Sequence, residues 1–151
     1  MPTEPQRKRK VYVASSWGNP LYPKVVEALR LAGHEVYDFR DANRAFSWAQ
    51  IDPSWDSANP VLTGDQLLRA LASPEAARAF AHDKGGLDWA DTGVVVMPCG
   101  RSAHIEAGYL IGRGVPVHFV LVDGERPDLM HLLAGLSNLH VDVSSVVEVL
   151  R

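Results

Sequence analysis

The chain has 151 residues, 46% of them hydrophobic and 22% charged, with a formal net charge of −3 and a pI of about 6.0. This length and balance predict one soluble globular domain with a core, and the weak negative charge argues against binding to nucleic acid or acidic membranes. No apolar stretch has the length of a membrane span or the character of a signal peptide. The single cysteine cannot form an internal disulfide, and this fits a protein of the reducing cytoplasm.

The N-terminal segment differs in composition from the rest of the chain. A basic run, Arg7–Lys10, follows the proline-containing segment Met1–Gln6. One interpretation is an arm that binds nucleic acid or phosphate, and the favoured one is a solvated leader before the first strand. We therefore expect a flexible basic tail over residues 1–10 and a single domain over residues 11–151.

Strand and helix signals alternate from residue 11. Val11–Ala14 is a short apolar run that predicts a strand, and it ends in a Ser-Ser-Trp-Gly-Asn turn at residues 15–19. Prolines after this turn favour a helix start, and Gly33 favours its end. His34–Phe39 predicts a second strand, so the chain opens with a strand, a helix and a strand.

The next segment, Arg40–Leu62, has little periodicity. It carries Phe46, Trp48 and Trp55 among Asp, Asn, Ser and Pro residues. Long irregular segments in compact domains are usually functional loops or disordered, and three large aromatic residues argue against disorder. The segment is therefore predicted to form a lid or a pocket wall.

Two helix starts follow this segment. Thr63 with Gln66 has the pattern of a capping box, and Ser73–Glu75 supplies a cap, a proline in the first turn and an acidic residue. The second helix is expected to extend towards Asp83, where Gly85–Gly86 interrupts the pattern.

The remaining chain continues the alternation of apolar strands and helices. The expected strands are Thr92–Met97, Val115–Val122 and Leu139–Val141, and the expected helices are Ser102–Arg113, Leu129–Leu136 and one capped by Ser145 with Glu148. This alternation predicts an α/β fold of the Rossmann or flavodoxin-like kind, a three-layer sandwich around a parallel sheet. Five strands in the order 2-1-3-4-5 is the simplest topology, with a switch point between strands 1 and 3.

A pocket is expected at this switch point, because open α/β sheets bind ligands where the strand order reverses. It would be lined by Ser15, Ser16 and Trp17 on one side and by Gly100–Glu106 on the other. Both segments are turns that follow the carboxyl ends of strands.

Glu106 is the most reactive group at this place. It lies in the first turns of the predicted helix, where a carboxylate is stabilised by the helix dipole without any further role. Its neighbours Ala103, Ala107 and Gly108 are small and leave room for a ligand. The position alone leaves a structural and a functional interpretation open.

The turn before Glu106 could hold an anion. Gly100–Ser102 precedes a helix, where backbone N–H groups point outward. The turn lacks the pattern of a P-loop, and the turn after the first strand lacks the dinucleotide-binding pattern. The favoured interpretation of Ser102 is a helix N-cap.

The other titratable residues give weaker signals. Asp83 resembles a surface residue, and Asp91 resembles a turn residue directly before a strand. Cys99 is interpreted as a small buried residue rather than a reactive thiol. The six histidines have no paired ligand spacing, so neither a metal ion nor another cofactor is expected.

These residues also form a pattern found in a known family. The chain resembles the nucleoside 2-deoxyribosyltransferase family, including its 2-deoxynucleoside 5′-monophosphate N-glycosidases, over nearly its whole length, with the specific block between Asp91 and Val117. The features that carry the resemblance are Ala14–Trp17, Asp83, Ala90–Asp91, Glu106–Tyr109 and Gly114–Val117.

The resemblance implies a chemistry. Glu106 would attack C1′ of a 2-deoxyribosyl group and form a glycosyl-enzyme ester, which another base or water resolves. Asp83 would contact the base and supply a proton, and Tyr109 and Ser15 would orient the nucleophile and the sugar. The residues expected to bind the nucleoside or nucleotide substrate are Ser15, Ser16, Trp17, Phe46, Trp48, Gly100, Arg101 and Ser102.

The sequence also departs from the family. Classical transferases carry a sugar-binding aspartate six residues before the nucleophile, and this chain has Gly100 at that position. They also have an aromatic C-terminal tail, whereas this chain ends at Arg151. Arg101 and the nearby serines would suit a 5′-phosphate, which favours the nucleotide hydrolases. Two alternatives stay open, a nucleotide- or nucleoside-binding sensor without turnover and a hydrolase of another N-glycosidic bond such as that of NAD. The resemblance further implies a homodimer or larger homo-oligomer.

Overall fold

A computed structural model describes residues 6–41, 46–55 and 60–151. The chain forms two compact units, one made of residues 1–38 and 89–151 and the other of Phe39–Asp88. The predicted division into a tail of residues 1–10 and a domain of residues 11–151 stays a prediction. Within the described ranges, no helix has the length and apolar character needed to cross a membrane.

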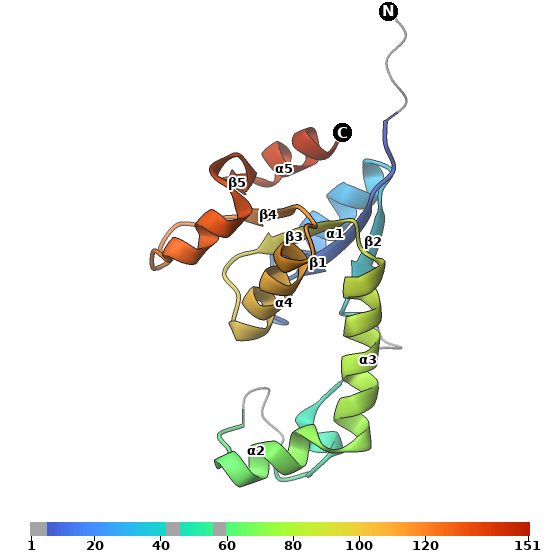
Figure 1. The fold of residues 1–151 in the computed structure, drawn as a ribbon, viewed down its shortest axis with the longest axis vertical. Helices are drawn as coiled ribbons and strands as arrows, with labels where there is room; N and C mark the ends of the chain where they lie inside the picture. Colours follow the sequence, from blue (N-terminus) through green and yellow to red (C-terminus); the bar gives the residue numbers. More distant parts are fainter. Residues whose placement is uncertain (1–5, 42–45, 56–59) are drawn as a thin grey trace, which may run out of the picture. The chain divides into compact units, whose positions relative to one another are not determined.

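The first unit is built on a five-stranded parallel sheet with the order β2-β1-β3-β4-β5 (Figure 1). This confirms the predicted fold class and strand order. The central strand is buried along its whole length, which explains its uninterrupted apolar sequence. The strands are β1 (Lys10–Ala14), β2 (Glu35–Asp38), β3 (Thr92–Val96), β4 (Val117–Val120) and β5 (Leu139–His140).

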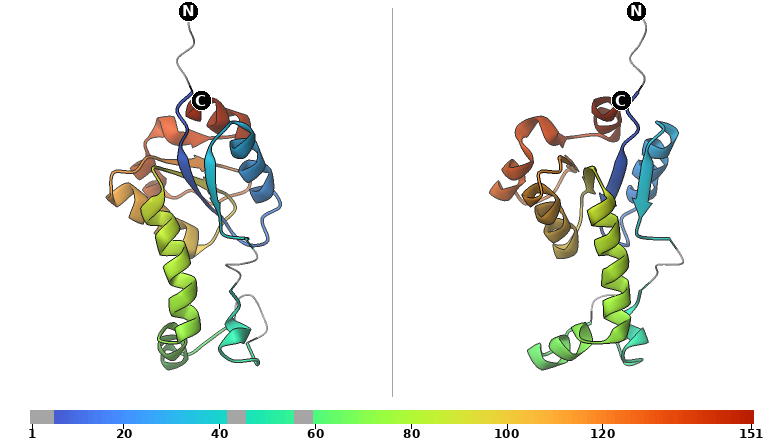
Figure 2. Two further views of the ribbon diagram at one scale, coloured as in Figure 1. Left: turned by 90° about the vertical axis from the view of Figure 1, so that its right-hand side faces the viewer. Right: turned by 45° about the vertical axis from the view of Figure 1, so that its right-hand side comes forward.

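Helices cover both faces of this sheet. Right-handed crossovers lead from β1 to β2 and from β3 to β4 in opposite directions along the sheet, so their helices α1 (Tyr22–Leu31) and α4 (Arg101–Gly112) lie on opposite faces. Helix α5 (Val143–Leu150) contacts α1 and therefore shares its face, as Figure 2 shows. The predicted three-layer arrangement is confirmed.

Helix α4 packs closely on the sheet through small residues. Ala103, Ala107 and Leu110 recur at the i, i+4, i+7 spacing of one helix face, and all three are buried. A Cβ atom added to Gly93 of β3 would lie 2.7 Å from Cδ1 of Leu110. The glycine therefore permits the close approach of helix and strand that fixes the position of α4.

The second unit contains a short 3-10 helix, η2 (Trp48–Gln50), the helix α2 (Gly64–Leu71) and most of α3 (Pro74–Trp89). The capping box of α2 is confirmed, because Thr63 N donates to Gln66 Oε1 at 2.9 Å and Gln66 N donates to Thr63 Oγ1 at 3.2 Å. Residues 42–45 and 56–59 of the predicted lid lie outside the described residues, and the lid stays a prediction.

The predicted interruption of α3 at Gly85–Gly86 is wrong, since the helix continues to Trp89. Each glycine costs a helix only about 1 kcal/mol relative to alanine. An ion pair between Lys84 Nζ and Asp88 Oδ2, at 2.6 Å and with i,i+4 spacing, bridges the two glycines. Gly86 is buried, where a small residue is an advantage.

Three predictions near helix ends also need correction. The N-cap of α4 is Gly100, so Ser102 lies inside the helix. The N-cap of α5 is Asp142, whose Oδ1 accepts a hydrogen bond from Ser145 N at 2.7 Å, because aspartate is a strong cap. The predicted helix Leu129–Leu136 consists of two 3-10 helices, η3 (Leu129–Ala134) and η4 (Leu136–Asn138), separated by Gly135 with φ 83°.

Two buried histidines meet on neighbouring strands of the sheet. Nδ1 of His118 on β4 lies 3.0 Å from Nε2 of His140 on β5. Burial lowers the pKa of His118 to about 4 and also lowers the pKa of His140. Both rings are therefore held neutral inside the fold.

We expect this pair to make the protein sensitive to acid. An unfolded histidine with a pKa near 6.5 binds a proton that folded His118 refuses until about pH 4, so the free energy of unfolding falls as the pH drops through this window. The loss should approach about 3 kcal/mol at pH 4. Urea unfolding between pH 4 and 8 measures it, and His118→Gln should flatten the slope while His82→Gln, at an exposed position in α3, should not. An equal slope in the His118→Gln variant would refute the assignment.

Candidate active site

The turns after β1 and β3 meet at the carboxyl edge of the sheet. Ser15 Oγ donates a hydrogen bond to the Val96 carbonyl at 2.7 Å, and Gly100 N donates to Ser16 Oγ at 3.1 Å. The structure thus brings Ser15, Ser16 and Gly100 together, as the topology predicts. The two turns form one rigid edge at the switch point.

Asn19 holds these turns together and was missed from the sequence. Its side chain is 4% exposed, and its Nδ2 group lies within hydrogen-bond distance of Ser15 Oγ at 3.0 Å and of the Val96 and Pro98 carbonyls at 3.2 Å. Its Oδ1 accepts a hydrogen bond from Leu21 N at 2.9 Å. The sequence signal was an asparagine three residues before a helix, which is also typical of ordinary turns.

Helix α4 presents two different flanks on either side of its buried face. At 100° per residue, Ser102, Glu106 and Tyr109 form one stripe, and His104, Gly108 and Ile111 form the opposite one. Glu106 is half-buried. Phe119 of β4 and residues of η3 line a cavity together with the second flank, so this flank faces β4 and η3. The Glu106 flank lies on the other side of the helix and is therefore directed towards β1, on the other side of β3 in the sheet.

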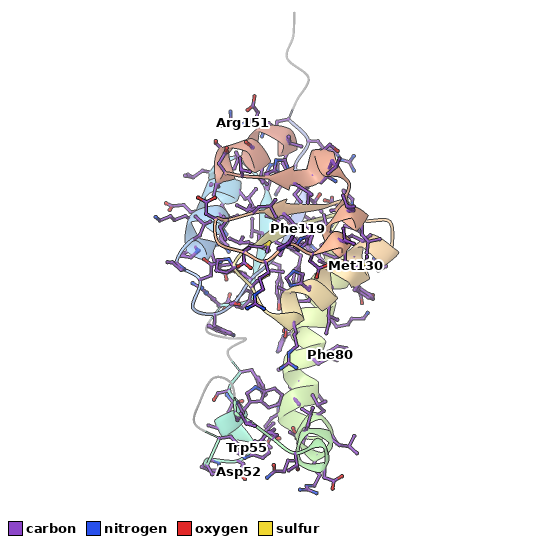
Figure 3. All side chains as sticks on the ribbon, turned by 90° about the vertical axis from the view of Figure 1, so that its left-hand side faces the viewer. Asp52, Trp55, Phe80, Phe119, Met130 and Arg151 are labelled. Carbon is purple, nitrogen blue, oxygen red and sulfur yellow. The ribbon has the colours of Figure 1, made fainter. Side chains whose placement is uncertain are left out.

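The cavity on the second flank has a volume of about 430 Å³ and does not include Glu106. Phe119 of β4 and Met130 of η3 lie at this flank (Figure 3). Of the predicted substrate-binding residues, Gly100 and Arg101 line it. The turn before α4 therefore borders both the Glu106 flank and this separate cavity.

Cys99 lies between the turn and the cavity. Its Sγ is 3.7 Å from Nδ1 of His104, five residues further along the chain. Burial, with smaller contributions from the charges of Glu125 and Glu106, raises the pKa of the thiol to about 11. At neutral pH the sulfur therefore carries its proton and is a poor nucleophile.

The other predicted site residues are divided between the two units. Trp17 is 53% exposed in the turn after β1, and Ser102 is exposed in the first turn of α4. Phe46 and Trp48 contact each other edge to face in the second unit, with ring centroids 5.0 Å apart. Asp83 lies on α3 within that unit, and its role stays a prediction.

Histidine pairs are a second feature that the sequence analysis missed. Nε2 of His104 lies 3.2 Å from Nε2 of His131, and the His118–His140 pair is buried elsewhere. In the part of the chain that the structure describes, no three His, Cys, Asp or Glu side chains are arranged to hold a metal ion. The pairs join elements that are distant in sequence, so residue spacing could not reveal them.

Neither family models nor curated proteins match this sequence. Among solved structures, a 2-deoxyribosyltransferase from Bacillus psychrosaccharolyticus is similar, with a TM-score of 0.56, 22% identity and coverage of 91% of this chain and 89% of that one. The chain shares its fold with that 2-deoxyribosyltransferase. The likeness therefore supports the arrangement of the sheet and helices around the switch point.

Two more distant structures also align. The CMP N-glycosidase BcmB from Clostridium botulinum has a TM-score of 0.45, with 18% identity and coverage of 93% of this chain and 96% of that one. A conserved protein from Enterococcus faecalis V583 has a TM-score of 0.44, with 12% identity and coverage of 95% and 88%.

Proposed function

We propose that the protein cleaves or transfers the N-glycosidic bond of 2-deoxyribonucleosides or their 5′-monophosphates, with Glu106 as a covalent nucleophile. The observation that carries the proposal is the place of Glu106. It is a half-buried carboxylate on the flank of α4 directed towards β1, and this helix begins after Gly100, whose N–H donates to Ser16 Oγ. A fold shared with a 2-deoxyribosyltransferase supports the same reaction class.

The proposed reaction has two displacements at C1′. A carboxylate oxygen of Glu106 attacks C1′, the C1′–N bond breaks, and its electron pair leaves with the base, which takes a proton from Asp83. Water or a second base then attacks C1′ and breaks the ester, and the proton that the water or the base loses returns to Asp83. Two inversions at one carbon leave its configuration unchanged.

The groups around the nucleophile have supporting roles in this proposal. Tyr109 lies one helical turn after Glu106 on the same flank and would orient its carboxylate. Arg101, Ser102 and the N-terminus of α4 would bind a 5′-phosphate, because N–H groups and a guanidinium favour anions. Trp17, which is exposed in the turn after β1, would cover the sugar or the base.

We expect base release from at least one substrate in a panel of 2-deoxyribonucleosides and their 5′-monophosphates, with kcat/KM higher for monophosphates by about tenfold or more. Chromatography of the released base measures the rates, and an added acceptor base separates transfer from hydrolysis. Arg101→Ala should remove the preference for monophosphates, whereas Arg30→Ala on α1 should keep it. If no substrate loses its base, the proposed reaction is refuted for this panel.

A second candidate function is a nucleoside- or nucleotide-binding sensor without turnover. Gly100 favours it, because this position lacks the carboxylate that binds the sugar in the classical transferases. A Cβ atom added at Gly100 would meet nothing within 4 Å. Packing would therefore allow a larger residue such as aspartate at this position. Tight binding measured by calorimetry, without product after long incubation, would support the sensor and exclude the enzyme.

A further inference from the structure

The cavity on the second flank of α4 has features that the proposed reaction does not use. Its volume of about 430 Å³ is within the usual range for small-molecule sites, roughly 300–1,000 Å³. It is lined by Cys99, Gly100, Arg101, His104, Ala107, Gly108, Ile111, Phe119, Asp128, Met130, His131 and Leu133, all within the first unit.

The wall of this cavity is aromatic. The ring centroids of Phe119 and His131 are 4.9 Å apart, those of His104 and His131 are 5.4 Å apart, and those of His104 and Phe119 are 6.2 Å apart. A cluster of rings offers faces and edges on which another planar ring can pack. The sulfur of Met130 adds a polarizable contact.

The helical side of the cavity leaves room for a flat molecule. Gly108 lines it, and a Cβ atom at this position would meet nothing within 4 Å. Ala107, the residue before Gly108, also lines the cavity with a small side chain. A planar ring can therefore lie against the backbone of α4 next to the aromatic wall.

The hydrogen bonds of the two histidines determine which groups the rim offers. Nδ1 of His104 lies 2.9 Å from the Gly100 carbonyl, which can only accept, so Nδ1 carries the hydrogen. With the hydrogen on Nδ1, Nε2 of His104 is the acceptor for the Nε2–H of His131, 3.2 Å away. This leaves Nδ1 of His131 as an acceptor at the cavity.

The cavity is lined by one positively and one negatively charged side chain, Arg101 and Asp128. Arg101 supplies guanidinium donors, and Asp128 supplies carboxylate acceptors, one of which already accepts a hydrogen bond from Met130 N at 2.8 Å. One positive and one negative group favour a ligand without net charge over either an anion or a cation. Because the rim of the cavity offers both hydrogen-bond donors and acceptors, it suits a planar ligand whose ring edge also carries both.

We propose that this cavity binds a small, uncharged, planar heteroaromatic molecule with donors and acceptors on its edge, of the chemical class of a free nucleobase. The ring would lie against the backbone at Gly108 and pack on the cluster of Phe119, His104 and His131. The inference rests on the cavity alone and does not require the proposed reaction at Glu106.

The test uses the full chain labelled with ¹³C at the methionine methyl groups. Met130 lines the cavity, whereas Met97 is buried elsewhere. A shift of the Met130 signal alone therefore reports binding in the cavity, and a shift of both signals reports a change in the whole structure. Adenine and thymine should shift the Met130 signal saturably and leave the Met97 signal in place. A ligand bound only on the Glu106 flank would leave the Met130 signal unchanged.

Two matched variants make the test specific. Gly108→Leu fills the cavity and should weaken the effect on Met130 by about tenfold or more, whereas Gly112→Leu, on the same helix outside the cavity, should leave it unchanged. If Gly108→Leu does not fold, His131→Ala removes part of the ring cluster and should weaken binding in the same way. No shift with either base, or equal binding by the cavity-filling and control variants, would overturn the proposal. None of these results would affect base release at Glu106, so the two proposals fail separately.

Discussion

Replacing Glu106 with glutamine should reduce base release by about 10³-fold or more, because an amide cannot form the ester at C1′ that the reaction requires. Glutamine has nearly the shape of glutamate, so the packing of α4 should be retained. Rates of base release with the best substrate of the panel, measured beside the thermal unfolding midpoint, would separate lost chemistry from lost structure.

Two controls accompany this variant. Glu106→Asp keeps a carboxylate but withdraws it by one methylene, and an intermediate rate is expected because nucleophiles act only within a narrow geometry. Glu148→Gln makes the same chemical change on α5, distant in sequence from the two joined turns, and should retain full activity. Full activity of the Glu106→Gln variant would refute the assignment of the nucleophile.

The second large effect is expected at the packing of α4 on the sheet. Leu110 is 1% exposed and contacts the position of Gly93 on β3, so Leu110→Ala removes buried methyl groups and leaves a hole. We expect the free energy of unfolding to fall by about 2–5 kcal/mol. Urea unfolding at pH 7 followed by circular dichroism measures this loss.

Ile105→Ala is the matched control, because Ile105 lies on the same helix but is 72% exposed. Its effect on the free energy of unfolding should stay within about 0.5 kcal/mol. Equal effects of the two substitutions would show that α4 does not depend on this buried face. The position of Glu106 would then lack the support that we ascribe to it.

The fold was largely predictable because its signals are local. The apolar run at Thr92–Val96 and the glycines that end α1 and α4 act on their own segments, and the right-handed crossover rule then leaves few topologies. Errors arose where local signals compete. Gly85–Gly86 indicated a helix break, yet Lys84 and Asp88 pair across it, and two 3-10 helices replaced one helix around Gly135.

The candidate site was predictable to a smaller extent. The topology placed Ser15, Ser16 and Gly100 at one edge, and the hydrogen bond between Ser16 and Gly100 confirms that placement. Asn19 and the contact of His104 with His131 depend on tertiary structure, because each links segments that only the fold brings together. No periodicity in a single sequence records such contacts.

The two flanks of α4 change how the motif around Glu106 is understood. Ser102, Glu106 and Tyr109 share one flank, whereas His104 and Gly108, from the same short motif, belong to the other. One helix therefore serves a proposed reaction on one side and a proposed binding cavity on the other. Substitutions within the motif should separate into two classes of effect.

Mass spectrometry after incubation with a 2′-deoxy-2′-fluoroarabinosyl nucleoside tests the central claim most directly. The fluorine disfavours the oxocarbenium-like transition state and slows release of the sugar, so the ester should accumulate. We expect the intact protein to gain the mass of one fluorinated sugar, located on the peptide that contains Glu106, and the Glu106→Gln variant to gain none. Base release without any adduct, or an adduct on another residue, would contradict the account.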